Sequence, residues 1–574
     1  MKSKLCYAIM FLSLFSLKAN AQAPDWLWAK GIGGINNDDG ISIAVDGSGN
    51  VFTTGQFEGV GDFDPGLGVF QLTSTVETDI FISKIDSFGN FMWAKAIGGN
   101  SFDIGNSIIL DASGNVYITG SFNGIVDFDP DSLENFNLTS SGLKDIFVCK
   151  LDGNGNFMWA KAMGGTSDDY GRSVAVDAFS NVYTTGSFKE IADFDPDSST
   201  NFNLTSAGSG DIFISKLDWM GNFIWAKSMG GTEYEEGHSI AIDDFGYVCI
   251  AGYFSGTVDF DPDSLGIFNL NSEGLTDIFI SKLNNSGSFS WAKSIGGITN
   301  DKCYSIALDA FSNVYATGYF TGIVDFNPNA GTFNLTSAGD DIFISKLDSS
   351  GNFIWGKAIG GTSGDRGLSI ALDAFGNVYT TGSFEGTTDF DPDSSGTFNL
   401  SSAGSGDMFI SKLDSAGNFS WARTSEGISL EEGLSIAIDR FGYTHVTGFL
   451  YSPTVLFDNT IISNIDSTSG YNGEFTSDVF IAKLSNTITG IENAQNTNDM
   501  SVYPNPATNH LTIALADNHK KVAITITDLT GKMIYSTTAT QKTEVNTTDF
   551  AQGVYLVQVQ AADFTETKKL IVVK

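Results

Sequence analysis

A tryptophan recurs at nearly constant spacing along most of this chain, and each copy opens a W-[AG]-[KR] triplet. Successive copies are 65, 66, 66, 66, 64 and 66 residues apart. They are Trp28, Trp93, Trp159, Trp225, Trp291, Trp355 and Trp421. A fixed period is the signature of a repeat architecture, in which each unit buries its apolar surface against its neighbours. This repeat therefore constrains the fold more than any other feature of the sequence.

Each repeat contains four short apolar runs separated by turn signals. In the third repeat these runs cover residues 173–177, 182–188, 211–218 and 223–227. Gly-Asn or Ser-Asn pairs mark many of the turns between them. No stretch shows a convincing 3.6-residue period, so we expect almost no helix. The sequence holds 65 Gly and 46 Phe against 10 Pro, which fits tight turns between aromatic-rich strands.

Four strands in each of seven repeats predict an all-β fold, a seven-bladed β-propeller over residues 22–490. An open β-solenoid is the alternative, because it also stacks repeats. The ends of the repeat region favour the ring. A Trp strand at 26–30 precedes the first inner strand, and the last unit ends after its third strand at 478–484. We expect the N-terminal strand to complete the last blade, since closure removes an exposed edge.

The repeats also resemble a known family of sequences. The runs SVAVDAFSNVYTTGSF at 173–188 and DIFISKLDWMGNFIWAKSMGG at 211–231 are similar to the bacterial β-propeller repeats called SBBP. The resemblance covers residues 26–486 and implies a propeller in a secreted or surface protein. The family as such implies no single activity, because a fold does not dictate a function.

The N-terminus has the pattern of a secretory signal peptide over residues 1–21. Lys2 and Lys4 form a charged start, residues 5–17 are mostly apolar, and Ala19-Asn20-Ala21 is an A-x-A cleavage site. The alternative is a membrane anchor, but the apolar run is shorter than the roughly 20 residues that span a bilayer. No other segment approaches that length, so we expect no transmembrane segment.

The C-terminal part differs in composition and follows a polar linker at 491–500. Residues 501–574 alternate with a period of two between turn signals, which predicts a small β-sandwich. The runs VYPNPATNHLTI, ITDLTGK, GVYLVQV and KKLIVVK resemble the C-terminal sorting domain of the type IX secretion system of Bacteroidetes. The resemblance implies export by that machinery, then tail removal and release or surface attachment. An appended sandwich that binds another partner is the alternative.

The charge is concentrated in the repeats. The chain has 67 acids and 30 bases, a net charge of −37, and residues 22–495 hold 60 of the acids and 20 of the bases. Seven of these 20 bases follow the Trp, seven lie in the third strand, and six lie elsewhere. Nucleic acid is disfavoured as a partner, because binding it requires clustered Lys and Arg. After signal removal, three isolated Cys residues remain, too few to predict a disulfide framework.

A D-F-D-P-D loop precedes the third strand in four repeats and is the best candidate metal site. Three carboxylates at alternating positions repel one another, and Ca²⁺ binds such clusters of oxygen ligands. Calcium is therefore the one cofactor that we predict. The alternative is that Asp and Pro only shape a tight turn. The complete loops contain Asp127, Asp129 and Asp131; Asp193, Asp195 and Asp197; Asp259, Asp261 and Asp263; and Asp389, Asp391 and Asp393.

Catalytic signals are poor, so we predict no catalytic residue and no enzyme. In the repeats, His238 and His445 are isolated, and no nucleophile, zinc or phosphate-loop motif occurs. The acidic pairs at 235–236 and 431–432 suggest glycosidase carboxylates, but such pairs arise by chance among 60 acids.

The favoured function is a secreted or cell-surface interaction module whose propeller loops bind an unknown glycan or protein. A structural or adhesive surface protein with calcium-stabilised loops is the second hypothesis. A polysaccharide-active enzyme is the third.

Overall fold

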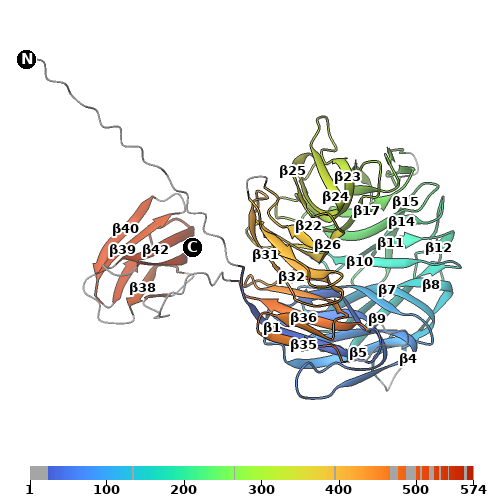
Figure 1. Ribbon diagram of the computed structural model, residues 1–574, viewed down its shortest axis with the longest axis horizontal. Coiled ribbons are helices and arrows are strands. Elements are labelled where there is room, and N and C mark those ends of the chain that lie inside the picture. Colours follow the sequence, from blue (N-terminus) through green and yellow to red (C-terminus); the bar gives the residue numbers. More distant parts are fainter. Residues whose placement is uncertain are drawn as a thin grey trace, which may run out of the picture. The chain divides into compact units, whose positions relative to one another are not determined.

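The computed structural model describes residues 23–131, 135–263, 266–393, 396–465, 476–486, 500–503, 507–515, 522–528, 532–540, 542–560 and 565–572 (Figure 1). The chain divides into two compact units, residues 1–489 and 490–574. The predicted signal peptide at 1–21 lies outside the described residues, and so does the predicted linker at 491–500 except Met500. None of the described residues is helical, so the prediction of an all-β chain is confirmed.

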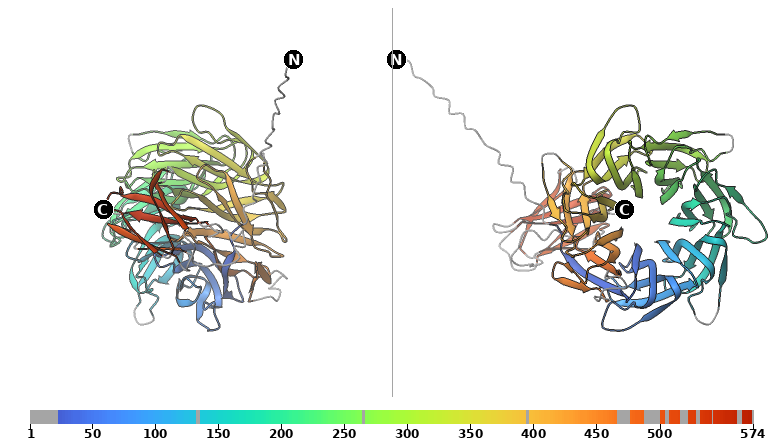
Figure 2. Two further views of the ribbon diagram at one scale, coloured as in Figure 1. Left: turned by 90° about the vertical axis from the view of Figure 1, so that its left-hand side faces the viewer. Right: turned by 45° about the vertical axis from the view of Figure 1, so that its right-hand side comes forward.

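In the first unit, the described strands pair into seven four-stranded antiparallel sheets, numbered here 1 to 7 along the chain. The first strand of each sheet lies at its inner edge (Figure 2). The first strands are β2 (Asp39–Val45), β6 (Ile104–Leu110), β10 (Tyr170–Val176), β16 (Glu236–Ile242), β22 (Lys302–Leu308), β26 (Asp365–Leu372) and β32 (Glu431–Ile438).

The second and third strands form the middle of each sheet. The second strands are β3 (Val51–Asp62), β7 (Val116–Asp127), β11 (Val182–Phe188), β17 (Val248–Phe254), β23 (Val314–Asp325), β27 (Val378–Phe384) and β33 (Thr444–Leu450). The third strands are β4 (Gln71–Ile85), β8 (Asn137–Leu151), β14 (Asp211–Leu217), β20 (Asp277–Leu283), β24 (Asn334–Leu347), β30 (Asp407–Leu413) and β36 (Asp478–Leu484).

The fourth strands carry the repeated Trp and lie at the outer edge. They are β5 (Phe91–Gly99), β9 (Phe157–Gly165), β15 (Phe223–Met229), β21 (Phe289–Ile295), β25 (Phe353–Ile359), β31 (Phe419–Thr424) and β1 (Trp26–Gly34). Short hairpins extend four sheets between their second and third strands. They are β12 (Ile191–Asp193) with β13 (Asn203–Thr205), β18 (Thr257–Asp259) with β19 (Asn269–Asn271), β28 (Thr387–Asp389) with β29 (Asn399–Ser401), and β34 (Thr454–Phe457) with β35 (Thr460–Ser463).

Asp-x-x-Gly-Asn turns explain why the strands end where they do. In sheet 1, Asp46 Oδ1 accepts the backbone N–H groups of Ser48 (2.8 Å) and Asn50 (3.0 Å). The Asn50 side chain donates to the other oxygen of Asp46 at 2.8 Å. Gly49 has φ +82°, a conformation that glycine adopts without steric cost. The carboxylate thus satisfies the backbone groups that the reversal leaves unpaired.

The first strands form a ring of contacts in the order β2, β6, β10, β16, β22, β26, β32 and back to β2. A serine on each first strand accepts the backbone N–H of an Ile or Val on the next one. Ser435 of β32 thereby accepts from Ile43 of β2 at 3.2 Å. β1 pairs with β36 along Trp26–Ile32, so the N-terminal strand supplies the fourth strand of sheet 7.

Buried carboxyl groups meet in pairs at the junctions between sheets. At the junction of sheets 1 and 2, Asp103 accepts the N–H groups of Gly99 (2.9 Å) and Asn123 (3.0 Å). Burial, together with nearby Asp79, raises the pKa of Asp103 to about 7. The pairs are Asp38 with Asp478, Asp103 with Asp79, Asp169 with Asp145, Glu235 with Asp211, Asp301 with Asp277, Asp365 with Asp341, and Glu431 with Asp407.

The Gly-Gly pair after most Trp triplets makes room for this junction. A Cβ atom on Gly98 would collide with the carboxyl group of Asp79. A Cβ atom on Gly99 would collide with the backbone carbonyl of Ile125 in the next sheet. Both glycines therefore allow a close approach that no larger residue permits.

The second unit is a β-sandwich by itself. One sheet contains β37 (Met500–Tyr503), β38 (His510–Leu515) and β41 (Lys542–Asn546). The other contains β40 (Met533–Ala539), β39 (Val522–Asp528), β42 (Gly553–Gln560) and β43 (Thr565–Val572). Buried apolar side chains such as Leu511, Ile513, Ile524, Val557 and Leu570 form one cluster in this unit.

Candidate functional site

The D-F-D-P-D loops begin where the second strands or their hairpins end. In sheet 3, Asp193 is the last residue of β12, and its backbone pairs with Gly164 at the end of the preceding sheet's fourth strand. Asp193 Oδ1 accepts the N–H groups of Asp195 (3.0 Å) and Phe202 (2.8 Å). Asp195 Oδ1 accepts the N–H of Asp197 (3.0 Å). The same bonds recur in the other three complete loops.

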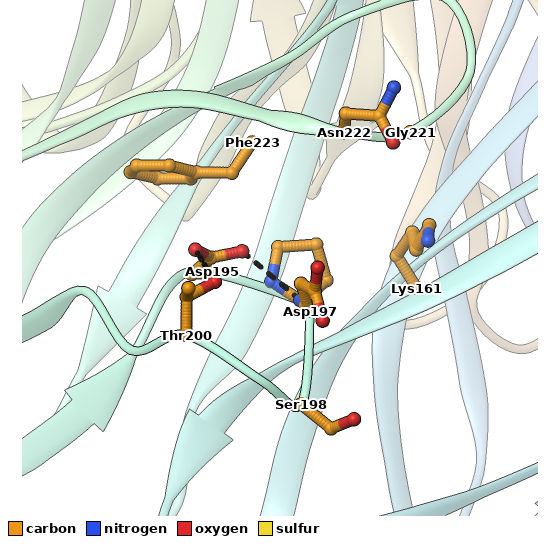
Figure 3. Close-up of a pocket in the computed structure, with 9 residues that line it drawn as sticks. Lys161, Asp195, Asp197, Ser198, Thr200, Gly221, Asn222 and Phe223 are labelled. Carbon is orange, nitrogen blue, oxygen red and sulfur yellow. Dashed lines mark hydrogen bonds between the residues drawn. The ribbon is translucent and has the colours of Figure 1, made fainter.

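The third Asp of three loops contacts a lysine of the preceding sheet. Asp131 pairs with Lys95 (2.7 Å), Asp263 with Lys227 (3.0 Å) and Asp393 with Lys357 (2.7 Å). In sheet 3, Lys161 and Asp197 instead line one open pocket of about 510 Å³ (Figure 3). Thr200 Oγ1 donates to Asp195 Oδ2 at 2.7 Å beside it. The three Lys–Asp ion pairs join neighbouring sheets at their outer edges.

Each Asp side chain of a loop binds backbone N–H groups of that loop or a neighbouring lysine, and the four loops lie on different sheets. In the described part of the chain, no three His, Cys, Asp or Glu side chains form a group that could hold a metal ion. Calcium binding by these loops stays a prediction. Adding Ca²⁺ to metal-stripped protein should raise its melting temperature, because a ligand that binds the folded state stabilises it. An unchanged melting curve would contradict the prediction.

His445 occupies a position that holds tyrosine in four other sheets. Its Nε2 atom lies 3.2 Å from Asp439 Oδ2, and burial lowers the pKa of the ring. The hydroxyl groups of Tyr117, Tyr183, Tyr315 and Tyr379 donate to the equivalent turn Asp at 3.1 to 3.3 Å. His445 thus replaces a structural tyrosine.

Within each adjacent acidic pair, 235–236 and 431–432, the two side chains contact different partners. Glu235 accepts the N–H of Gly231 at a sheet junction (3.0 Å), whereas Glu236 accepts from Tyr253 (2.6 Å) and Arg172 (2.5 Å). Likewise, Glu431 lies at a junction and Glu432 accepts from Ser383 (3.0 Å). Neither adjacent pair therefore acts as a unit across a cleft.

An array of exposed phenylalanines lies on one face of the first unit, at the turns between first and second strands. We call it the Phe face. It consists of Phe179, Phe245, Phe311, Phe375 and Phe441 on sheets 3 to 7, with 51% to 81% of each residue exposed. The sequence analysis missed it. The available signal was a Phe at the third position of six D-x-F-[GS]-x turns, five between first and second strands and one, at 86–90, between the third and fourth strands of sheet 1.

Pockets with polar groups in their lining separate neighbouring phenylalanines of the Phe face. A pocket of about 540 Å³ between Phe245 and Phe311 contains Asp243, Lys282, Ser312, Ser349 and Ser350. Another of about 490 Å³ lies between Phe311 and Phe375, and one of about 210 Å³ lies between Phe179 and Phe245. The face therefore alternates flat apolar rings with hydrogen-bonding groups.

Comparison with known families matches both units. Residues 501–573 match the secretion system C-terminal sorting domain. Residues 159–187, which include the Trp of sheet 2 and the first two strands of sheet 3, match the β-propeller repeat of the SBBP type. The chain thus contains a β-propeller repeat of the SBBP type and a secretion system sorting domain. The sorting domain places the protein on the type IX export route, with secretion and cell-surface or outer-membrane attachment.

Two curated relatives share part of the chain with this propeller protein. An uncharacterized WD repeat-containing protein, L264, of Acanthamoeba polyphaga mimivirus is 25% identical over 537 residues. That match covers 78% of this chain and 38% of the relative. The regulatory protein FlaEY of Caulobacter vibrioides is 26% identical over 145 residues, 25% of this chain and 15% of that protein. The propeller protein therefore spans well under half the length of either relative.

A solved fungal alcohol oxidase of the AA5 family, in complex with copper, aligns with 96% of the propeller protein and 98% of its own chain. The TM-score is 0.39 and the identity 11%, values too low to support a shared fold or activity. Among the residues that the structure describes, no helix is long and apolar enough to cross a membrane.

Proposed function

We propose that this protein is a secreted or cell-surface binding module, exported by the type IX machinery through residues 501–574, whose propeller binds a glycan on the Phe face. The observation that carries the proposal is the alternation of exposed phenylalanines with polar pockets. Large exposed apolar side chains that recur on one face are typical of interaction sites.

The composition of the Phe face favours a glycan over a protein. Aromatic rings pack against the apolar faces of sugar rings, and the Asp, Ser and Lys groups between them match sugar hydroxyls. A protein partner would instead favour one contiguous apolar core with a polar rim. The recurrence on five sheets fits a polymer of repeating units, and the net charge of −37 favours a neutral one.

A glycan and surface-protein array probed with the mature chain tests the proposal. We expect binding to neutral polysaccharides and its loss in the Phe311→Ala, Phe375→Ala double variant. Phe102→Ala is the matched control, because Phe102 is also exposed but lies at the opposite end of the first strands. Selective binding to a protein would contradict the glycan assignment, and binding by neither class would contradict the module itself.

Two readouts separate the alternative functions. Release of reducing sugar from a bound polysaccharide would identify an enzyme. Self-association that depends on Ca²⁺, without glycan binding, would identify an adhesive surface component. Neither result is expected if the propeller is a binding module.

A further inference from the structure

A second group of side chains departs from the repeat, at the opposite end of the first strands from the Phe face. Six bases in residues 22–495 lie outside the two repeated slots, and four of them gather here. They are Lys144 at the inner part of β8, Arg172 on β10, Lys302 on β22 and Arg366 on β26. Together with Glu236, His238, Tyr253 and Tyr304 they form what we call the inner cluster. Repeated residues serve the fold, so a concentrated departure from the repeat marks a function.

The inner cluster is one continuous network across neighbouring sheets. Arg172 Nε donates to Glu236 (2.5 Å), which lies 3.4 Å from His238 Nε2. The His238 ring is 5.1 Å from that of Tyr304, and the Tyr304 ring is 5.9 Å from that of Tyr319. Farther along, the Arg366 guanidinium lies 5.3 Å from the centre of the Tyr319 ring. Aromatic rings and cations thus lie side by side near the start of the first strands.

The acids of the inner cluster already have partners. Glu236 receives Arg172, Tyr253 and His238, and these contacts hold its pKa well below the usual range. Asp340 accepts from Thr321 (2.8 Å) and from Arg366 (3.3 Å). The carboxylates of Glu236 and Asp340 are therefore already paired within the network.

Two lysines of the inner cluster form no close ion pair among the residues that the structure describes, although Lys144 lies near Asp103 and Lys302 near Glu236. Lys302 Nζ lies 4.0 Å from the centre of the Tyr253 ring. Lys144 Nζ lies 5.6 Å from the Tyr170 ring and 5.9 Å from the Phe102 ring. Both side chains are partly exposed. In a protein with 67 acids, two half-buried ammonium groups held over aromatic rings are positioned for an external anion.

We infer that the inner cluster binds a carboxylate-bearing sugar. The ammonium group of Lys302 would pair with the carboxylate, and the partly exposed ring of Tyr304, two residues farther along β22, would pack against the sugar ring. A highly charged polymer is disfavoured, because the rest of the propeller is strongly acidic and repels it. Phosphate recognition favours bidentate arginine forks, and here both arginines are engaged with carboxylates.

The site is independent of the Phe face. First strands such as β10, β16 and β22 have seven residues, so the two regions lie about 20 Å apart at roughly 3.3 Å per residue. Substitutions on the Phe face should therefore leave binding at the inner cluster unchanged.

Calorimetric titration of the mature chain with galacturonate, galactose, inorganic phosphate and a glutamate-rich peptide tests the inference. We expect galacturonate to bind, galactose to bind at least tenfold more weakly, and added salt to weaken binding. Lys302→Met and Tyr304→Ala should each lower the affinity for galacturonate at least tenfold. Lys293→Met is the matched control, because Lys293 occupies a repeated slot and contacts Asn329 instead.

Thermal melting of each variant shows whether it is folded, and the affinity ratio is read only between folded variants. Unchanged galacturonate binding in a folded Lys302→Met variant would overturn the inference, as would no binding by the parent chain. Tighter binding of phosphate or of the peptide would also overturn it, in favour of those ligands.

Discussion

Comparison of the repeats explains why a buried histidine stands at position 445. Tyrosine at this position of the second strand contacts the turn Asp with its hydroxyl group and lies under the third-strand lysine. In sheet 6, for example, Lys412 Nζ lies 4.6 Å from the centre of the Tyr379 ring. His445 keeps the contact to Asp439 with a smaller ring. The position thus needs a buried ring with a polar tip.

We predict that His445→Tyr folds with a free energy of unfolding within about 1 kcal/mol of the parent, because four other sheets hold tyrosine there. His445→Ala should cost about 2–4 kcal/mol, since it leaves a cavity and removes the partner of a buried carboxylate. Denaturant unfolding of both variants measures the difference. Equal stability of the two variants would contradict this account of the position.

Residue roles were predictable where repeats could be compared. The Trp that recurs in every repeat packs within its own sheet, as where the Trp93 ring centre lies 6.1 Å from that of Phe52. The inner cluster was not predictable from the sequence, because the positions of strands along the chain do not reveal which side chains of neighbouring sheets come into contact. Third-strand lysines such as Lys84 lie over the aromatic rings of the second strand. Four of them also lie within 4 Å of the turn Asp that precedes that strand: Lys282, Lys346, Lys412 and Lys483.

The junction between neighbouring sheets depends on glycine at the end of the fourth strand. We predict that Gly98→Ala costs about 2–3 kcal/mol or more, because its Cβ atom has to displace the buried carboxyl group of Asp79. Gly47→Ala is the matched control. A Cβ atom there would meet only Arg440, at 3.9 Å, and should change stability little. Thermal melting of the two variants side by side checks the difference.

The buried acids at the same junctions predict a pH dependence of stability. Burial raises the pKa of Asp38 to about 8, those of Asp103, Asp169 and Glu431 to about 7, and that of Asp145 to about 6. A carboxyl with a raised pKa in the folded state stabilises the fold fully below its unfolded pKa, near 4, and loses that contribution as pH rises through the folded value.

The melting temperature should therefore fall as pH rises from about 5 to about 8 at constant salt. Differential scanning calorimetry across this range measures the slope. A melting temperature that rises over the same range would show that these groups are ionised in the folded protein. Asp103→Asn should reduce the slope, because it removes one titrating group while keeping a polar side chain.

At the level of elements, the four-strand repeat unit was predictable because its turns carry Asp, Gly and Asn at fixed positions. The extra hairpins such as β12–β13 were not, because three-residue strands leave no periodic pattern. The loop acids remain a predicted calcium site. Their contacts to the lysines of a neighbouring sheet could not be foreseen, since Lys95 and Asp131 are 36 residues apart.

The pairing of β1 with β36 joins the two ends of the repeat region and gives sheet 7 its fourth strand. We predict that a mature chain lacking residues 22–34 melts well below the parent, because it exposes an unpaired edge and uncovers the cluster around Trp26 and Phe457. Removal of residues 500–574 is the control, and it should leave the propeller transition unchanged. Equal melting of the parent and the N-terminally truncated chain would contradict this role of β1.

On the scale of the whole molecule, the chain combines a sorting domain with a propeller that carries the Phe face and the inner cluster at opposite ends of its first strands. The sorting domain gives the destination, and the Phe face gives the proposed activity there. The high negative charge of the chain has a structural explanation. Much of it comes from acids that recur at turns, junctions and loops, and the bases outside the repeated slots are concentrated in the inner cluster.

Titration calorimetry of the mature chain with a neutral polysaccharide identified on the array tests the central claim most directly. We predict saturable binding with more than one glycan segment per chain, since the pockets recur between neighbouring phenylalanines. The Phe311→Ala, Phe375→Ala double variant should lower both affinity and stoichiometry, whereas Phe102→Ala should change neither. Binding that is unchanged in the folded double variant would contradict the claim.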